Sequence, residues 1–179
     1  MSLIREETLT GDALKDIAVR MMIAARTAPK ARGINTLVMM LAEGASIEKL
    51  ASRMEEIADE YEQPFFKRDA GNILQSPVIL LMGTSIKTIG LIKCGMCGYE
   101  SCDEKSKHPD VPCAFNTGDL GIAVGSAVST AMQYKVDNRI MYTVGQAALD
   151  LGFFEPEIKI VYGIPICAES KSPFFDRKK

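Results

Sequence analysis

Four of the five cysteines in the chain lie within residues 93–115, in the stretch K-C-G-M-C-G-Y-E-S-C-D-E-K-S-K-H-P-D-V-P-C-A-F. Cys94, Cys97, Cys102 and Cys113 form a C-x2-C-x4-C-x10-C pattern, in which glycines follow the first two cysteines. Thiols concentrated in this way in an otherwise cysteine-poor chain are typical of a metal site. We therefore interpret residues 93–115 as a metal-binding loop, called the cysteine loop below, and the remaining chain as its scaffold.

The spacing of the thiols favours one class of metal centre without excluding others. Cysteines at C-x2-C spacing can reach one metal centre from a single tight turn, and neighbouring glycines relieve crowding there. Zinc sites usually contain two such knuckles, whereas three close cysteines and a distant fourth, beside Pro112, are nearer to iron–sulfur usage. Zinc and free thiols in a flexible loop stay open as alternatives. His108, the only histidine, is a candidate to replace the fourth ligand or is simply solvated.

Composition limits the classes of function. The 179 residues are 47% hydrophobic and 25% charged, which is typical of a folded globular domain. A formal net charge of -2 gives no electrostatic footprint for nucleic acid or an anionic membrane. No apolar run approaches the length of a membrane span, and the N-terminus turns acidic where a signal peptide would be apolar. We expect a cytoplasmic protein whose cysteines are reduced thiols or metal ligands.

Hydrophobic periodicity predicts a mixture of helices and strands along one domain, residues 1–179, with the cysteine loop inserted within it. Helices are expected over residues 12–26, 46–62 and 119–133, with short ones over 69–74 and 146–151. Thr10 or Asp12 is expected to cap the first helix, and Asn116 or Thr117 the helix that follows the loop. Strands are expected over residues 34–41, 77–82, 86–92, 139–144 and 157–162. The helix over 119–133 is small and apolar on nearly all sides, so we expect it at the centre of the fold.

The loop also resembles known iron–sulfur proteins. C-G-M-C-G-Y-E-S-C is similar to the C-G-x-C-G-x-x-x-C signature of the [4Fe-4S] domain in corrinoid iron–sulfur proteins and in a subunit of a redox-driven ion pump. Over its whole length the chain resembles a family of uncharacterised bacterial and archaeal proteins that contain a ferredoxin domain, through K-C-G-x-C-G and P-C-A-F. The resemblance implies a [4Fe-4S] cluster on Cys94, Cys97, Cys102 and Cys113, but the family supplies no established activity.

Outside the loop the chain resembles the nitroreductases. The resemblance rests on A-A-R-T-A-P-K-A-R-G after the first helix, the central small-residue helix, and I-V-Y-G-I-P followed by a basic tail. It implies an α+β fold with a central mixed or antiparallel sheet flanked by helices, an intertwined homodimer, and bound flavin mononucleotide (FMN). The residues that it assigns to the flavin are Arg26, Lys30, Arg32, Asn35 and Arg177.

The chain departs from the nitroreductase pattern at two places. The arginine-rich stretch expected at the N-terminus is reduced to Arg5, and the P-S-x-x-N turn is replaced by P-K-A-R-G. The side chain expected beside the flavin ring is therefore either missing or moved to Asn35. The alternative is that the cations form a solvated helix end and tail. Cys167, between apolar residues, is expected to be buried and inert.

These observations lead to two hypotheses. The first is an iron–sulfur protein of electron transfer that exchanges electrons with a redox partner protein or a small-molecule electron donor. With FMN in a neighbouring cleft it would be a flavin-linked oxidoreductase, and only then an enzyme. The alternative is a zinc-stabilised binding or scaffold protein without catalysis. We expect neither nucleic acid nor membrane as a partner.

Overall fold

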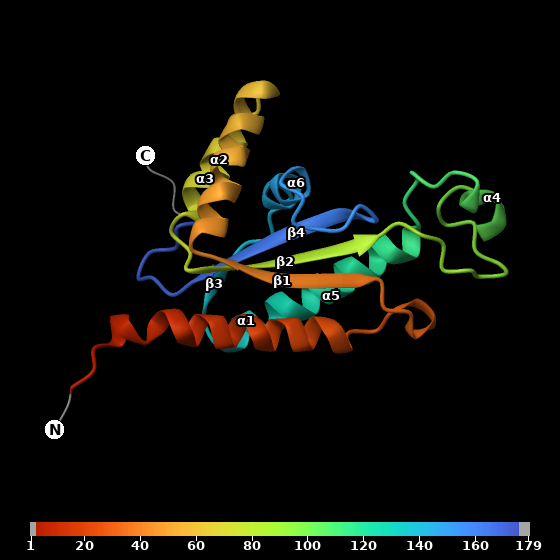
Figure 1. The fold of residues 1–179 in the computed structure, drawn as a ribbon. Helices are drawn as coiled ribbons and strands as arrows, with labels where there is room; N and C mark the ends of the chain where they lie inside the picture. The colour runs from red at the N-terminus through yellow and green to blue at the C-terminus, as the bar shows by residue number, and fades with distance from the viewer. Residues whose placement is uncertain (1–2, 176–179) are drawn as a thin grey trace.

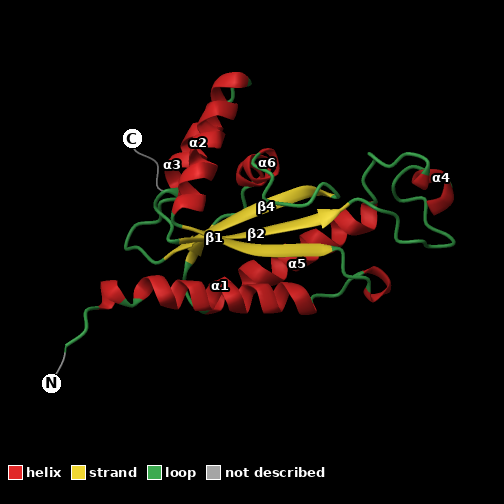
Figure 2. Ribbon diagram, viewed as in Figure 1, coloured by secondary structure: helices red, strands yellow, loops and turns green. Residues whose placement is uncertain are grey.

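The computed structural model describes residues 3–175, which form a four-stranded sheet between two layers of helices (Figures 1 and 2). The strand order is β1-β2-β4-β3, and each neighbouring pair is antiparallel. The strands are β1 (Leu37–Glu43), β2 (Val78–Ser85), β3 (Asp137–Asn138) and β4 (Ile158–Cys167). The predicted α+β architecture with helices on both sides of a central sheet is confirmed.

Strand β2 lies at the centre of the sheet, and all eight of its residues are buried. Its side chains alternate between the two faces, as the period of a strand requires. Ile79 and Leu81 enter one hydrophobic core, whereas Leu80 and Met82 enter the other. Burial on both faces explains why this strand is a continuous apolar run in the sequence.

One face of the sheet is covered by α1 (Thr10–Thr27) and α5 (Ala114–Gln133), which lie below it in Figure 1. A short 3-10 helix, η1 (Glu6–Thr8), precedes α1. Leu14 and Met21 of α1 and Leu120 and Ala127 of α5 are almost completely buried in the core between these helices and the sheet. The small-residue helix was expected at the centre of the fold, but it lies in an outer layer. Its small side chains pack closely against α1 and the sheet, whereas its other side, which includes Gly121 and Ile122, is exposed.

The other face is covered by α2 (Ala45–Glu60), α3 (Pro64–Ile73) and α6 (Tyr142–Asp150). Helix α6 lies directly on β4, and the closest approach is at Gly145. A Cβ atom at this position would be 1.8 Å from the carbonyl oxygen of Val161. Only glycine therefore allows the observed distance between helix and strand.

Two predicted strands are wrong. Residues 86–92 have no strand structure, because side chains rather than a neighbouring strand bind their carbonyl oxygens, as described below. Residues 139–144 contain only a bridge at Met141 before α6 begins at Tyr142, and the adjacent strand pairing is at β3. The predicted strand over residues 34–41 starts later, at Leu37, because a 3-10 turn, η2 (Ala31–Gly33), occupies the preceding residues.

Helix boundaries also differ from the predictions. Helix α1 begins at Thr10 itself, with Leu9 at the N-cap. Helix α3 begins at Pro64, a position where proline is tolerated because the first N–H groups of a helix have no partner within it. Helix α5 begins at Ala114, five residues earlier than predicted, directly after the last cysteine of the loop.

None of the helices among residues 3–175 is long and apolar enough to cross a membrane.

Candidate metal centre

The cysteine loop lies in the connection from β2 to α5 and projects from one end of the sheet, on the right in Figure 1. Its one helical segment is α4 (Cys102–Ser106). Ser101 is the N-cap of α4, and its hydroxyl oxygen accepts a hydrogen bond from the backbone N–H of Glu104 at 3.1 Å. Cys113 is the N-cap of α5, so its sulfur lies where the helix dipole favours negative charge.

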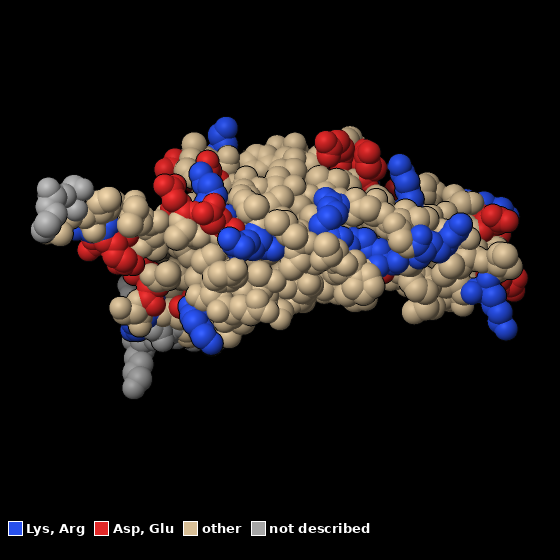
Figure 3. All heavy atoms as spheres, turned by 90° about the horizontal axis from the view of Figure 1, so that it is seen from below, with Lys and Arg blue, Asp and Glu red and all other residues tan. Residues whose placement is uncertain are grey.

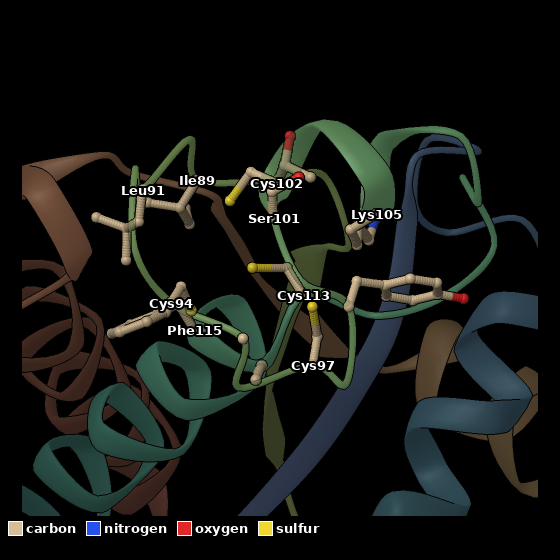
Figure 4. A pocket seen from close by; sticks show the side chains of 13 residues that line it. Ile89, Leu91, Cys94, Cys97, Ser101, Cys102, Lys105, Cys113 and Phe115 are labelled. Carbon is tan, nitrogen blue, oxygen red and sulfur yellow. The ribbon is translucent and has the colours of Figure 1, made fainter.

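All four cysteines of the loop line one pocket (Figure 4). Cys113 is buried, and Cys94, Cys97 and Cys102 are half-buried. In Figure 4 the sulfurs of Cys97, Cys102 and Cys113 point toward a shared space. The folded chain therefore brings together four thiols that are spread over residues 94–113 of the sequence.

The pocket is narrow, and the thiols do not form a finished coordination site. The space between the lining residues is about 10 Å³, close to the volume needed for one water. Among residues 3–175, no group of three or more cysteine, histidine, aspartate or glutamate side chains is spaced to hold a metal ion. The donor set fits a thiolate-bound metal or cluster, and binding requires the loop to adjust around it.

Two glycines shape the turn that joins the first cysteines. Gly95 and Gly98 have φ of +77° and +89°, conformations that glycine adopts without steric cost. The N–H of Gly98 donates to the carbonyl oxygen of Gly95 at 3.0 Å, which closes the turn around Cys97. A side chain at either glycine would strain this turn. The backbone conformation therefore explains why glycine follows each of the first two cysteines in the C-G-x-C-G pattern.

Three side chains hold the approach to the loop, residues 86–92, by binding its carbonyl oxygens. Arg32 donates to Ile89 and Gly90 at 3.0 and 3.1 Å. Lys105 donates from Nζ to Ile86 at 2.7 Å. The amide of Asn116 donates to Ser85 and Lys87 at 2.9 and 2.7 Å. These contacts replace the hydrogen bonds that a strand would make.

Sequence reasoning missed two of these three residues as parts of the site. Asn116 was expected to cap α5, but it lies within the first turn, is completely buried, and points its amide at the segment before the loop. Lys105 is 2% exposed although it lies in a charged stretch of sequence. Nothing in the sequence distinguishes Lys105 from the neighbouring Lys107, which is exposed and paired with Glu104.

The only histidine lies outside the pocket. The ring of His108 stacks on that of Tyr99, with 4.8 Å between centroids and 20° between planes. Its Nε2 is 3.9 Å from a carboxylate oxygen of Glu104, and the side chain is about half exposed. Tyr99 lines the cysteine pocket and His108 does not. The histidine is therefore next to the site through its contact with Tyr99, but it does not face the four thiols.

Four of the five residues assigned to the flavin lie where α1 leads through η2 into β1, and their described hydrogen bonds are to backbone carbonyl oxygens. Arg26 donates to Leu37 at 3.3 Å, and the amide of Asn35 donates to the same oxygen at 3.4 Å. Arg32, at φ +56°, bridges to residues 89 and 90 before the cysteine loop. Arg177 lies outside the described residues.

Lys30 has a different environment from the arginines. Its ammonium donates to the carbonyl oxygens of Ala25, Arg26 and Ala28, at the C-terminal end of α1. All three N–H donors are thus used on the helix terminus, where a cation also complements the dipole. Burial lowers the pKa of Lys30, the nearby Arg26 lowers it further, and Asp119 opposes the shift. Asp119 is itself buried, and its carboxylate accepts from the backbone N–H of Ala31 at 2.9 Å.

The surface around these residues carries a band of positive charge. Seen from below, Lys and Arg side chains run from the middle of the molecule toward the end with the cysteine loop (Figure 3). A broad uncharged area adjoins the band. The distribution places cations near the candidate metal centre although the chain as a whole has a net charge of -2.

Cys167 is remote from the pocket, because it pairs with Asp137 at the end of β4 that lies beside the start of β2. The cysteine loop follows the other end of β2. Cys167 is 1% exposed, and burial raises the pKa of its thiol from 9.0 to about 11, with smaller contributions from Asp137 and Glu169. It is therefore a protonated, inaccessible thiol at neutral pH.

Comparison with known proteins identifies relatives of the whole chain and of its fold. A family model described as "Uncharacterized protein containing a ferredoxin domain" matches residues 109–177, a range that includes Cys113 but not the first three cysteines of the loop. An uncharacterized protein from Archaeoglobus fulgidus is 40% identical over 183 residues, covering 98% of this chain and 97% of the relative.

Solved structures share the fold at low sequence identity. An oxidoreductase described as containing FMN has a TM-score of 0.60 at 16% identity, covering 88% of this chain and 68% of that one. A nitroreductase with bound FMN from Bacteroides fragilis has a TM-score of 0.62 at 10% identity, covering 99% and 84%. The predicted nitroreductase-like fold is confirmed by these similarities.

Proposed function

Because the chain belongs to a family of uncharacterized proteins that contain a ferredoxin domain, we propose that it is an iron–sulfur protein of electron transfer. Cys94, Cys97, Cys102 and Cys113 would hold a [4Fe-4S] cluster as thiolates. The observation that carries the proposal is that all four thiols line one pocket at the end of a nitroreductase-like scaffold. Reduced thiols are retained most readily in the cytoplasm, where we place the protein.

The chain's own residues would supply binding, shape and shielding. The positive-φ glycines let Cys94 and Cys97 approach one centre from a single turn. Ile89, Leu91 and Phe115 line the pocket beside the thiols and limit access of water. When bound, the cluster supplies one-electron transfer, by which a redox partner protein or a small-molecule donor is oxidised and an acceptor is reduced.

FMN as that acceptor is the second part of the proposal. Its support is the fold, since two structural neighbours are described with FMN, and the cations beside the cysteine loop. Arg26 and Arg32 each use only one guanidinium nitrogen in the described contacts, so further N–H donors remain for a phosphate. We propose that these arginines and Arg177 bind the phosphate and that Asn35 lies near the ring. Lys30, whose three donors are used, would organise the helix end.

A second copy of the chain is proposed to complete the flavin cleft. Helix α5 contains a single charged residue, Asp119, which is buried. Its exposed positions include Gly118, Gly121 and Ile122, and a Cβ on either glycine would contact nothing within 4 Å. In a two-fold symmetric dimer the same face of both copies is in contact, and a face with small residues and no charge can pack against its own copy without repulsion. Light scattering should give the mass of a dimer for the wild type and of a monomer for Ile122→Glu; a monomeric wild type would contradict this part.

Anaerobic purification tests the cluster. The wild type should be coloured, contain iron and acid-labile sulfide in equal amounts, and bleach on reduction. Cys97→Ser should lose the colour and most of the iron, whereas Cys167→Ser should keep both because Cys167 is remote from the pocket. Stoichiometric zinc without sulfide would exclude the cluster. Reconstitution with FMN, followed by gel filtration and absorption at the flavin bands, tests the second cofactor independently.

The zinc-stabilised scaffold is the second candidate function. The observation that favours it is the narrow space of about 10 Å³ between the lining residues, which is closer to the needs of a single ion than of a cluster. Four thiolates are a common ligand set for structural zinc. This candidate predicts a colourless protein with one zinc per chain and no exchange of electrons with dithionite.

A further inference from the structure

Lys105 is a buried cation that forms no ion pair with a carboxylate of residues 3–175. Its side chain is 2% exposed. Its described hydrogen bond is to the carbonyl oxygen of Ile86 at 2.7 Å, and none of the ion pairs formed within residues 3–175 includes it. Burying an ammonium without an opposite charge costs several kcal/mol. A compensating negative charge is therefore expected close by.

The pocket that Lys105 lines contains one candidate for that charge. Lys105 shares the pocket with Cys94, Cys97, Cys102 and Cys113 (Figure 4), and the lining residues, all within the described part of the chain, include no carboxylate. Four thiolates around a metal ion or iron–sulfur core leave a net negative charge at the centre. A thiolate centre would thus meet the electrostatic requirement that the ammonium creates.

We infer that Lys105 is the internal counter-charge of the metal centre and that it raises the reduction potential of the bound cluster. The inference rests on the proposed function. Reduction adds an electron to a centre that is already negative, so a nearby cation stabilises the reduced form more than the oxidised form. Burial strengthens the effect, because solvent and salt screen a buried charge much less than an exposed one. Lys105 is a tuning residue and does not ligate the metal.

A purely structural role is the competing explanation. Lys105 also anchors the segment before the loop through Ile86, and loss of that hydrogen bond alone could loosen the site. Three substitutions separate charge from anchoring. Lys105→Gln keeps an N–H donor without the charge, Lys105→Arg keeps both, and Lys105→Met keeps neither. Lys107→Met is the matched control, because Lys107 lies at the end of the same short helix but is exposed and paired with Glu104.

The test is a redox titration of each purified protein, followed by absorption and electron paramagnetic resonance. Iron and sulfide are measured on the same samples. Lys105→Gln and Lys105→Met should retain the cluster and lower the midpoint potential by at least 59 mV, which is a tenfold change in the ratio of reduced to oxidised centre for one electron. Lys105→Arg and Lys107→Met should stay close to the wild type. A fully loaded Lys105→Gln with the wild-type potential would overturn the inference.

Two further outcomes are distinguishable from these. If the Lys105→Gln and Lys105→Met proteins fail to retain iron, Lys105→Arg decides: retention supports the counter-charge, and loss in all three variants overturns it in favour of packing. If the wild type holds zinc without sulfide, the proposed function fails. The counter-charge is then judged by competition with a chromophoric chelator, in which Lys105→Gln should bind zinc at least tenfold more weakly than Lys107→Met. Equal affinities would overturn it.

Discussion

Asn116 should be among the most sensitive polar residues of the chain, because its buried amide donates to two carbonyl oxygens at the base of the cysteine loop. Its side chain is completely buried and donates to Ser85 at 2.9 Å and to Lys87 at 2.7 Å. Asn116→Ala removes this donor from both oxygens, at a cost of about 1–3 kcal/mol for the buried oxygen of Ser85 and less for that of the exposed Lys87. The oxygen of Ser85 keeps a longer hydrogen bond, 3.3 Å, from the hydroxyl of Thr84. The Oδ1 of Asn116 has no partner among residues 3–175, so its removal offsets part of the loss. We expect a net destabilisation of about 1–3 kcal/mol.

Urea unfolding followed by circular dichroism measures this cost. With a slope typical of a small protein, the midpoint should fall by about 0.5–1.5 M. Asn116→Leu should be similarly destabilised although it fills the space, which separates the lost hydrogen bonds from a cavity effect. Thr117→Ala is the matched control. Thr117 is an exposed neighbour whose hydroxyl donates to the backbone carbonyl oxygen of Cys113 at 3.2 Å, and this bond should contribute less than about 0.5 kcal/mol.

The refuting result is an Asn116→Ala protein whose free energy of unfolding is within about 0.5 kcal/mol of the wild type. The carbonyl oxygens of residues 85 and 87 would then be satisfied without Asn116, and its amide would not be what holds the approach to the cysteine loop. The same variant should also increase hydrogen exchange in residues 86–92. Destabilisation without that increase would place the effect in the core around α5 instead.

Four more outcomes follow from the packing and the charges. Gly145→Ala should destabilise the protein by about 3 kcal/mol or more, because its Cβ would overlap a carbonyl of β4. Gly71→Ala is the control: its Cβ would lie in open space on α3, so it should be neutral or stabilising. Thermal denaturation of the two variants and the wild type measures the difference. Burial raises the pKa of Cys167 from 9.0 to about 11, so the folded state keeps a proton that the unfolded state loses; the stability of the wild type relative to Cys167→Ala should fall as the pH rises from 9 to 11. Arg53 lowers the pKa of Glu60 through a direct hydrogen bond, so the ion pair contributes stability above the ordinary value of 4.5; the destabilisation by Arg53→Met, measured in urea, should shrink as the pH falls below it. In protein that contains the proposed metal centre, chelation should increase hydrogen exchange throughout the cysteine loop and leave β2 protected.

The sequence was most informative where a local pattern and burial agree. The apolar run of β2 and the amphipathic patterns of α1 and α2 each predict an element that the structure contains. In these elements the positions of the apolar residues follow directly from burial on one side or on both. The four-thiol pattern identified the stretch that folds around one pocket. The arrangement of these elements around a central sheet was predicted from the resemblance to nitroreductases and not from periodicity.

The errors arise where distant side chains determine the backbone. Residues 86–92 contain strand-forming residues, yet Arg32, Lys105 and Asn116 bind their carbonyls from three other parts of the chain. A pattern along one segment contains no information about such partners. The burial of Lys105 was equally hidden, since its position depends on how α4 folds back over the pocket.

The two hydrophobic clusters, one on each face of the sheet, are separate from the cysteine loop. Both hydrophobic clusters are built from residues of the sheet and its covering helices, and neither includes a residue between 86 and 119. The base of the loop is attached by polar contacts, chiefly those of Arg32 and Asn116, and by the buried side chains of Ile86 and Ile89, which belong to neither cluster. The free energy that orders the metal centre is therefore largely separate from that of the sheet. A metal whose only role was to stabilise the scaffold would be expected to connect with a core, so this separation favours the redox hypothesis over the zinc scaffold.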